Sequence, residues 1–513
     1  MHRLLILIVV LTCGALSVMA QKGKGDETVD ARGDMYYAAN CYTRALDEYY
    51  KAYAKKNSNP LLLRRITECI MELDIARDTA IFFIDAYLQQ VSDDAEAVYM
   101  SAQAYFHAHQ FDKAKQRLDK YKEMVGEKGI TLRERKFERF IEDAKRMVKN
   151  PMKNRMVNLG DMINTPYSEL TPYIMNDNTL VFSSDEKFST AAMLNIFNIK
   201  YSEYEGLSWS KSRAIAGQVN TTYDEYVCGV HGNHMFFNSN RTTTFSIWEC
   251  DAKGSGRFTD GVKLESPIDG EGDEVAATLS FNGDTIIYSA TTKDGDLDIY
   301  YSIKVKGEWG PARLLPGAIN KQESDENYPQ LTPDGKRLYF CSDREGSMGG
   351  YDLFYSDLDE KTGEWGEPVQ MPYPINDTYD NTTISFTSNG RYGYISSIRK
   401  DGFGSRDIYA VIFDNVPAAI GILKCFVGID AKPKAQPLGE QPLIRVMNSK
   451  GELAATANLN LRSSTFILAL EPDTYTISID ANGAEHYEEK LVIEERLYED
   501  NALERIILLK PKL

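Results

Sequence analysis

The sequence contains little cysteine and little histidine, with seven cysteines and six histidines among 513 residues. The cysteines stand singly and form no CxxC pair, which excludes the usual disulfide-dense and zinc-ribbon scaffolds. Two histidine pairs, His107/His109 and His231/His234, have no acidic or cysteine third ligand close by in the sequence. Because zinc needs three or four such ligands, we expect a structural or solvent-exposed role for both pairs and no metal site.

The motifs of common enzyme classes are also missing. The sequence holds no GxSxG elbow, no Walker loop, no HExxH and no dinucleotide fingerprint. Asp294, Asp296 and Asp298 resemble the start of a calcium loop, but Val305 stands at the twelfth position, where such a loop needs glutamate. The sequence therefore predicts a protein that is not an enzyme and uses no cofactor. A propeller hydrolase is the least favoured interpretation, because such enzymes carry a separate catalytic domain with a nucleophile elbow.

Basic charge and long apolar runs are scarce. Lysine and arginine number 58 against 75 aspartates and glutamates, a formal net charge of −17. This balance excludes nucleic acid as a partner, because phosphate binding needs a basic face. After residue 20 no run approaches the roughly 18 apolar residues that a membrane span requires, so no span is expected.

Residues 1–20 have the pattern of a signal peptide. Arg3 gives the positive start, Leu4–Leu11 the apolar run, and Val18-Met19-Ala20 the cleavage site. Cys13 suggests lipidation as an alternative, but Leu11-Thr12 before it is a poor lipobox. We therefore expect an exported periplasmic protein, associated with the outer membrane.

The main feature that is present is a repeat of about 50 residues, a period typical of stacked or radial repeat proteins. Its best copy, Tyr328–Tyr355, reads YPQLTPDGKRLYFCSDREGSMGGYDLFY. The central aromatic residues lie 55, 51, 52 and 54 residues apart; they are Phe182, Phe237, Tyr288, Phe340 and Tyr394. An Asn-Gly or Asp-Gly dipeptide recurs after the first strand, where positive φ at both positions would favour a tight hairpin. Four such strands per copy predict a β-propeller of five blades, possibly six, over residues 151–417.

The ends of the repeats predict how the ring closes. Fourth strands finish on Val219-Asn220, Ile319-Asn320 or a similar phrase, and Ile163-Asn164 matches it although it precedes the first copy. The last copy has only three strands and runs out at Pro417. We therefore expect the segment 157–164 to supply the missing fourth strand, which would remove open sheet edges.

The flanking regions differ in composition. Residues 21–150 read as a tetratricopeptide (TPR)-like helical domain, with Ala45, Ala80 and Ala114 at spacings of 35 and 34 residues. Thr131 and Glu134 predict a capping box for a terminal helix that runs to about residue 148. Exposed aromatic candidates on these helices, for which inter-helix packing is the alternative, are Tyr36, Tyr37, Tyr42, Tyr49 and Tyr50.

Residues 418–513 show short alternating strands, which predict a small β-sandwich. The stretch LEPDTYTI, Leu470–Ile477, resembles the strand entry of carboxypeptidase-regulatory-like domains, although Asp473-Thr474 replaces the usual glycine. The predicted architecture is therefore multidomain, α then β.

One constellation is a candidate partner-binding site. Acidic residues precede the first strand of successive blades, with Glu169 as the degenerate member; they are Asp224, Glu225, Asp273, Glu274, Asp325, Glu326 and Asp380. In a closed ring they would share one face near the opening and form an acidic collar for a basic peptide or a cation. The alternative is that they are solvated turn residues or caps of backbone amides.

The order of these regions resembles PorE-type envelope proteins of Bacteroidetes, in which TPR units, a TolB-type (PD40, WD40-like) propeller and a regulatory-like sandwich follow a signal peptide. The LTPDGKRLYFCSDREGSMGGYDLFY stretch is the most specific part of the resemblance. Some members serve type IX secretion and gliding, and an OmpA-like domain that binds peptidoglycan usually follows. Because no such segment follows here, peptidoglycan binding is not expected.

The resemblance implies a non-enzymatic scaffold or adaptor that binds other envelope proteins, possibly within a type IX secretion apparatus. The alternative is a TolB-like periplasmic sensor or carrier that binds a peptide or glycan on the propeller face.

Overall fold

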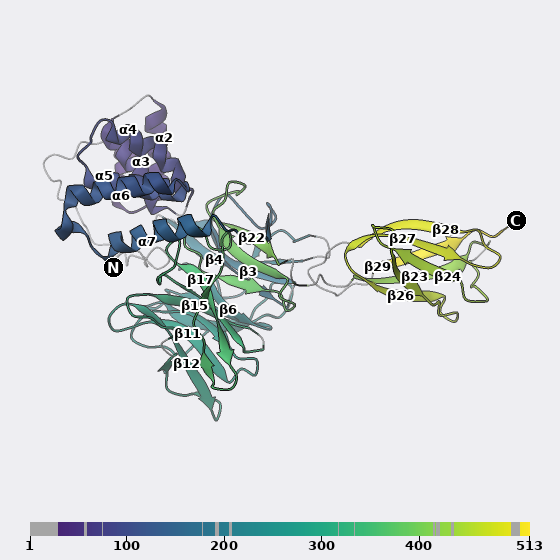
Figure 1. Cartoon of the computed structure of the whole chain (residues 1–513). Coiled ribbons are helices and arrows are strands. Elements are labelled where there is room, and N and C mark those ends of the chain that lie inside the picture. The colour runs from purple at the N-terminus through teal and green to yellow at the C-terminus, as the bar shows by residue number, and fades with distance from the viewer. Residues whose placement is uncertain are drawn as a thin grey trace. The chain divides into compact units, whose positions relative to one another are not determined.

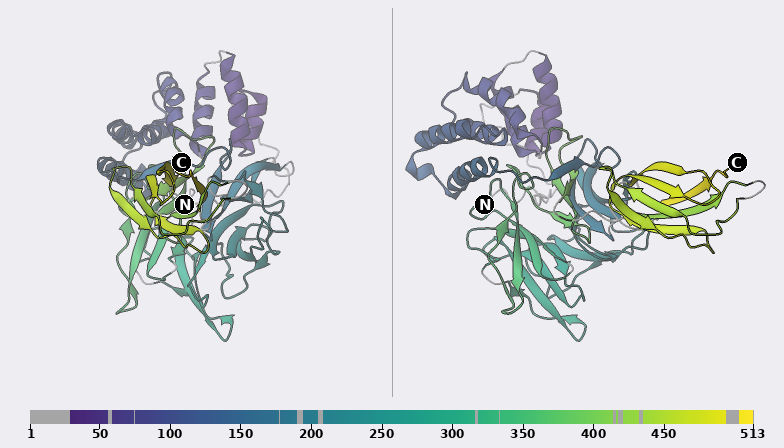
Figure 2. Two further views of the ribbon diagram at one scale, coloured as in Figure 1. Left: turned by 90° about the vertical axis from the view of Figure 1, so that its right-hand side faces the viewer. Right: turned by 45° about the vertical axis from the view of Figure 1, so that its right-hand side comes forward.

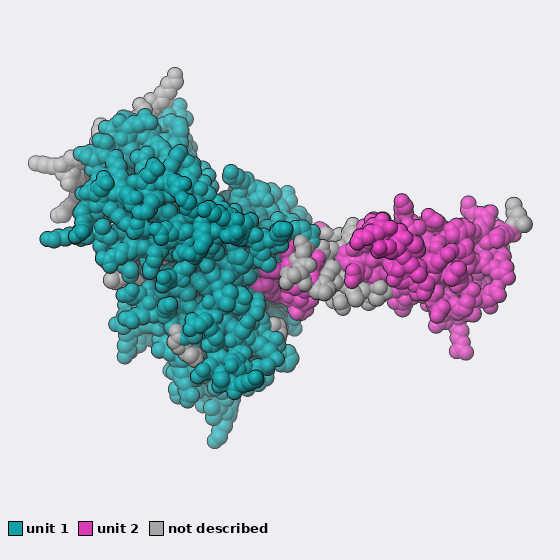
Figure 3. Space-filling view, in the orientation of Figure 1, with its two compact units in different colours: residues 1–202, 210–385, 393–411 teal, residues 203–209, 386–392, 412–513 magenta. Residues whose placement is uncertain are grey.

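Figure 1 shows the computed structural model of the chain, in which helices precede strands. The structure describes residues 29–55, 59–73, 75–176, 178–189, 194–204, 208–315, 318–332, 334–413, 416, 421–431, 435–493 and 503–512. The predicted signal peptide, residues 1–20 with Cys13, lies outside them. The chain divides into two compact units (Figure 3), which are residues 1–202 with 210–385 and 393–411, and residues 203–209 with 386–392 and 412–513.

The first unit begins with a helical region. Its helices are α1 (Ala31–Ala38), α2 (Tyr42–Ala54), α3 (Pro60–Glu72), α4 (Ala80–Leu88), α5 (Ala95–His107), α6 (Phe111–Val125) and α7 (Leu132–Met147), with 3-10 turns η2 (Arg77–Thr79) and η3 (Glu127–Gly129). Asn59 and Asp94 cap α3 and α5 by accepting backbone N–H groups. The predicted capping box of α7 is confirmed, because Thr131 and Glu134 bond each other's backbone.

Small buried side chains hold these helices together. Ala45, Ala80 and Ala114 are each fully buried, and such small residues allow helix axes to approach closely. Tyr49, Tyr99 and Ile66 fill the space between the helices, which stack side by side in Figure 2. The periodic alanines of the sequence therefore lie in the helical core.

Four antiparallel sheets of consecutive strands follow. They contain β2 (Glu169–Met175), β3 (Thr179–Ser189), β4 (Leu194–Glu203) and β5 (Arg213–Ala214); β6 (Glu225–His231), β7 (His234–Ser239), β8 (Ser246–Asp251) and β9 (Val262–Lys263); β10 (Glu274–Leu279), β11 (Thr285–Thr291), β12 (Leu297–Val305), β13 (Glu308–Trp309) and β14 (Arg313–Leu314); β15 (Glu326–Leu331), β16 (Arg337–Ser342), β17 (Asp352–Asp359), β18 (Glu364–Trp365) and β19 (Val369–Gln370). Each sheet matches one copy of the sequence repeat.

A further sheet combines two distant parts of the chain. Its strand order is β1 (Arg155–Asn158), β22 (Asp407–Ile412), β21 (Tyr392–Ser397) and β20 (Ile384–Phe386). Thus β1, which precedes the first sheet in sequence, is the outermost strand of the last. The same sheet joins the first one, because the Glu169 N–H donates to the Arg406 carbonyl at 2.8 Å and the Ile174 N–H to Ser385 Oγ at 3.0 Å.

The hairpin turns differ from the sequence expectation in their backbone angles. Gly283, Gly335 and Gly390 have φ of 71°, 72° and 70°, but Asn282 and Asn389, which precede two of these glycines, are not among the described residues with positive φ. Each glycine N–H instead bonds the carbonyl three residues earlier, at 2.8 Å. Positive φ at both positions was therefore wrong, and the glycine alone provides the left-handed conformation.

The second unit contains a two-layered β-sandwich. One sheet has the order β26 (Thr465–Leu470), β23 (Gly421–Ile429), β29 (Leu503–Leu509), and the other β25 (Leu453–Ala457), β24 (Leu443–Met447), β27 (Asp473–Asp480), β28 (Tyr487–Ile493). Strands β23 and β29 pair in parallel, whereas the other pairs are antiparallel. Leu423, Val446 and Ile479 are among the buried residues of its core.

Candidate functional site

The aspartates of the acidic collar bond the backbone of the neighbouring sheet. Each accepts an N–H from a residue at the start of the preceding sheet's third strand. The pairs are Phe197 to Asp224 at 2.9 Å, Phe245 to Asp273 at 2.8 Å, Leu297 to Asp325 at 2.8 Å and Tyr351 to Asp380 at 2.9 Å. These four carboxylates therefore connect successive sheets.

The glutamates of the collar are buried. Glu225, Glu274 and Glu326 each accept a backbone N–H from the loop just before them, at 3.0, 2.9 and 3.0 Å. Glu169 makes the same bond to Thr165 at 3.0 Å. The alternative stated from the sequence, that these residues cap backbone amides, therefore describes the bonds of the four glutamates. Partner binding by the acidic set stays a prediction.

Two of these glutamates pair with arginines, of which Arg344 is buried and Arg241 is half-buried. Arg344 lies 3.0 Å from Glu326, and its guanidinium lies 4.9 Å from the Phe340 ring and 5.3 Å from the Phe354 ring. Arg241 lies 3.0 Å from Glu225 in the same arrangement. Both arginines also donate to a backbone carbonyl of the loop, that of Val219 or Ile319, which stands directly before the asparagine that recurs between the copies. Sequence spacing did not reveal these pairs, because their partners meet only across the sheet.

Glu274 has neither the serine nor the arginine that Glu326 has beside it. The positions that hold Ser342 and Arg344 beside Glu326 are Ala290 and Thr292 beside Glu274, as the strand register shows. Its Oε2 has no hydrogen-bond partner. Burial and the nearby Asp269 and Asp273 carboxylates raise the pKa of Glu274 to about 8. This carboxyl group is therefore protonated at neutral pH.

The helical region contacts the sheets through an interface that the sequence did not indicate. Tyr379 receives the Arg77 N–H on its hydroxyl at 3.0 Å, and its ring stacks on the His107 imidazole at 4.4 Å. His109 packs edge-on against Tyr373, with 5.9 Å between ring centroids. Burial lowers the pKa of His109. The expectation of a structural role for this histidine pair fits its place in the interface.

The other histidine pair lies at a hairpin end of the second sheet. His234 Nδ1 lies 3.0 Å from Asp251, and its Nε2 lies 3.2 Å from Glu249. Although burial opposes the change, these carboxylates raise the pKa of His234. Throughout the described residues, no group of three histidine, cysteine or acidic side chains could hold a metal ion. The six described cysteines are buried.

An aromatic surface on helices α2 and α4 is the strongest candidate for partner binding. This helical aromatic patch consists of Tyr50, Tyr53, Phe82 and Phe83, with ring centroids 5.2–6.4 Å apart in successive pairs. Phe82 is 63% exposed and Tyr50 is 38% exposed. Of the five tyrosines considered from sequence, only Tyr50 is exposed, whereas Tyr36 and Tyr49 are buried. Clustered exposed aromatic side chains are typical of protein-binding surfaces.

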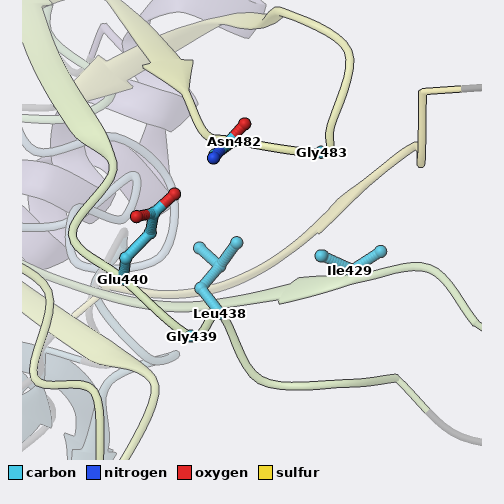
Figure 4. A pocket seen from close by; sticks show the side chains of 6 residues that line it. All are labelled: Ile429, Leu438, Gly439, Glu440, Asn482 and Gly483. Atoms are coloured by element: carbon cyan, nitrogen blue, oxygen red, sulfur yellow. The ribbon is translucent and has the colours of Figure 1, made fainter.

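The sandwich carries a shallow hollow of about 470 Å³ (Figure 4). Its lining residues are Ile429, Leu438, Gly439, Glu440, Asn482 and Gly483. Glu440 and Asn482 offer hydrogen-bonding groups, and the lining contains no serine, threonine, cysteine, lysine or histidine. Within the described part of the chain, none of the helices combines the length and apolar character that a membrane crossing requires.

Comparison with known proteins gives similarities among solved structures only. No family model matches the chain, and no curated protein matches it. TolB from Acinetobacter baumannii is 11% identical with a TM-score of 0.28, and the match covers 66% of this chain and 70% of that one. A putative TolB from Agrobacterium tumefaciens is 15% identical with a TM-score of 0.27, covering 51% and 99%. A thermostable family-43 glycoside hydrolase is 12% identical with a TM-score of 0.33, covering 53% and 94%. Similarity at this level carries no information on activity or partners.

Proposed function

We propose that this chain is a non-enzymatic scaffold that binds other proteins of the cell envelope. The observation that carries this proposal is the helical aromatic patch. Burying Phe82, at 63% exposure, together with Tyr50 against a partner would remove a large apolar area from water. Aromatic side chains of this kind dominate the energy of protein interfaces.

The proposed architecture is a TPR-like array on a five-bladed β-propeller, followed by a regulatory-like sandwich. The pairing of β1 with β22 and the bonds from Glu169 and Ile174 to the last sheet support a closed ring. A ring without free edges is a stable platform for binding. The alanines buried between the helices support the TPR assignment.

The bonding of the acidic residues supports a binding role over catalysis. Glu225 and Glu326 are paired with arginines and backbone amides, and the aspartates connect sheets. Carboxylates used in this way stabilise the fold and are not positioned for proton transfer to a substrate.

The proposed location is the periplasm, next to the outer membrane. The order of regions and the signal-peptide pattern of residues 1–20 support export. A role in type IX secretion rests on the family resemblance alone. The acidic net charge of −17 favours partners with basic surfaces.

The test is recovery of partners from envelope extracts after cross-linking in cells, with full-length chain and a Phe82→Ser variant. We expect discrete proteins in fixed ratio to the chain, and about tenfold less recovery with the variant, because one central aromatic anchor often carries a large share of the binding energy. Phe281→Ser, which removes another highly exposed aromatic ring, is the matched control and should leave recovery unchanged.

Equal recovery by the wild type and the Phe82→Ser variant would contradict the proposed surface. Recovery of a peptide or glycan in place of proteins would instead favour the sensor or carrier function.

A further inference from the structure

Three loops that enter the first strand of a sheet share one turn and one tyrosine. In each, a tyrosine stands three residues after an asparagine: Asn164 and Tyr167, Asn220 and Tyr223, Asn376 and Tyr379. The tyrosine N–H bonds a side-chain oxygen two residues earlier, that of Thr165 at 3.2 Å, Thr221 at 3.1 Å and Asp377 at 2.9 Å. The three loops therefore present their tyrosines with the same local geometry.

A second bond fixes the same turn in all three loops. The N–H after the asparagine donates to a side chain four residues on, at 3.0 Å for Thr165, 3.0 Å for Thr221 and 2.7 Å for Asp377. Because the acceptors in Glu169, Glu225 and Asn381 are buried, the turns are anchored to their sheets. Rigid presentation lowers the entropy lost when such a side chain binds.

In one of the three loops, residues of the helical region of the same chain bind the tyrosine side chain. Tyr379 is only 8% exposed, because the helical region covers it. The Arg77 N–H from η2 donates to its hydroxyl at 3.0 Å, and the His107 imidazole stacks on its ring at 4.4 Å and 24°. The Arg77 guanidinium lies 5.9 Å from the ring. The Tyr379 side chain thus binds one backbone N–H donor through its hydroxyl, and an imidazole and a guanidinium through its ring.

The other two tyrosines are open. Tyr167 is 40% exposed and Tyr223 is 49% exposed. Phe403, itself exposed, lies on the loop whose Ser405 N–H bonds the Tyr167 carbonyl at 3.1 Å. The exposed rings therefore combine apolar area with a hydroxyl, as interface tyrosines do.

The loop that carries Tyr223 lies close to the interface between the helical region and the sheets. Lys187 donates to the Thr221 carbonyl at 2.9 Å, in the loop that carries Tyr223. Its neighbour Phe188 lies 3.7 Å below the guanidinium of Arg44 from helix α2. The Tyr223 loop is thus adjacent to the point where the helical region contacts the first sheet.

We propose that Tyr167 and Tyr223 form a second docking surface, for a separate protein that presents the chemistry seen at Tyr379. That partner offers an arginine or histidine side chain over each ring and a free backbone N–H from a helix end or turn. Cation–π attraction and the acidic net charge of −17 favour the cationic group. This inference rests on the proposed scaffold function and assigns to it a surface distinct from the helical aromatic patch.

The test places a photo-crosslinking benzoylphenylalanine at position 167, 223, 82 or 281 of the full-length chain in its native cells. We expect the adducts from 167 and 223 to contain the same protein, attached at a helix end or turn that carries arginine or histidine. Position 281 is the control and should give no such adduct. Adducts only at position 82 would refute this inference and leave the scaffold function standing, whereas no adduct at any position would refute both.

Two double variants then separate the ring from the hydroxyl with the purified partner. Replacing both tyrosines by serine should weaken binding by about tenfold or more, because aromatic anchors carry much of an interface's energy. Replacing both by phenylalanine should weaken it less, because the ring contact remains. The melting temperature should not change in either variant. Unchanged affinity of the serine variant, or adducts that join two copies of this chain, would overturn the proposal.

Discussion

The asparagine that recurs at the end of the repeats makes the same two hydrogen bonds in several sheets. Asn220, Asn320 and Asn376 each accept the N–H and donate to the C=O of one residue in the third strand, at 2.7–3.0 Å. Asp269 stands at this position in another copy, and a carboxylate cannot donate such a bond. Glu274, five residues later, lacks the arginine that pairs with Glu225 and Glu326. This copy of the repeat therefore places the buried Glu274 near a half-buried aspartate, Asp269, which pairs with Lys263 at 2.8 Å.

Glu274 makes the stability of the chain depend on pH. Its pKa is about 8 in the folded chain and 4.5 as its ordinary value, so between these values the folded chain binds more protons than the unfolded chain. The contribution is complete below pH 4.5 and is lost as pH rises through 8. Between pH 5 and pH 9 the free energy of unfolding should fall in both the wild type and the Glu274→Gln variant. We expect the fall to be about 1–2 kcal/mol smaller in the variant.

Urea denaturation at three pH values measures this difference. Glu271→Gln, an exposed change on the same loop, is the control and should behave as the wild type. Parallel pH curves for the wild type and the Glu274→Gln variant would refute the assignment.

At the scale of elements, strand β1 depends on Asn164. The Asn164 amide accepts the Ile408 N–H at 2.8 Å and donates to the Ile408 C=O at 3.1 Å. It also donates to Asn158, at the end of β1, at 2.8 Å. These bonds attach the segment before the first sheet to the last sheet.

Asn164→Ala should loosen this attachment. Three buried or half-buried bonds are lost, so we expect a loss of about 2–3 kcal/mol of stability. Hydrogen exchange should become faster at β1 and β22 and remain slow at β11. Asn320→Ala removes the equivalent bonds to Ile299 in β12. It should instead make hydrogen exchange faster at β12. Unchanged exchange at β1 would show that Asn164 does not hold the strand.

The sequence predicted elements better than it predicted sites. The 50-residue period gave the sheets, and the strand expected over 157–164 is seen as β1, which overlaps it at Val157 and Asn158. For the glutamates the sequence left both an acidic collar and caps of backbone amides open, because a sequence shows charge but not burial. The partners of Glu326 and Tyr379 come from other strands and helices, so no local pattern marks them. The Asn-x-x-Tyr spacing at 164, 220 and 376 was the one signal that could have indicated the tyrosine loops.

At the scale of the whole molecule, the first unit combines a helical array and five sheets through specific contacts. Lys136 of α7 lies 2.6 Å from Asp343, which adds an ion pair to the contacts of Tyr379. The helical aromatic patch and the open tyrosine loops are both on this unit. A scaffold that carries two separate surfaces can bring two partners to one place, with a gain from effective concentration.

The most direct measurement is the mass of the native complex, determined by light scattering after mild extraction and size separation. The scaffold account predicts one species heavier than the exported chain by whole copies of partner proteins. This species should be lost when Phe82, Tyr167 and Tyr223 are all replaced by serine. A species of the chain's own mass that turns over a peptide or glycoside, with turnover abolished by a single substitution, would contradict it.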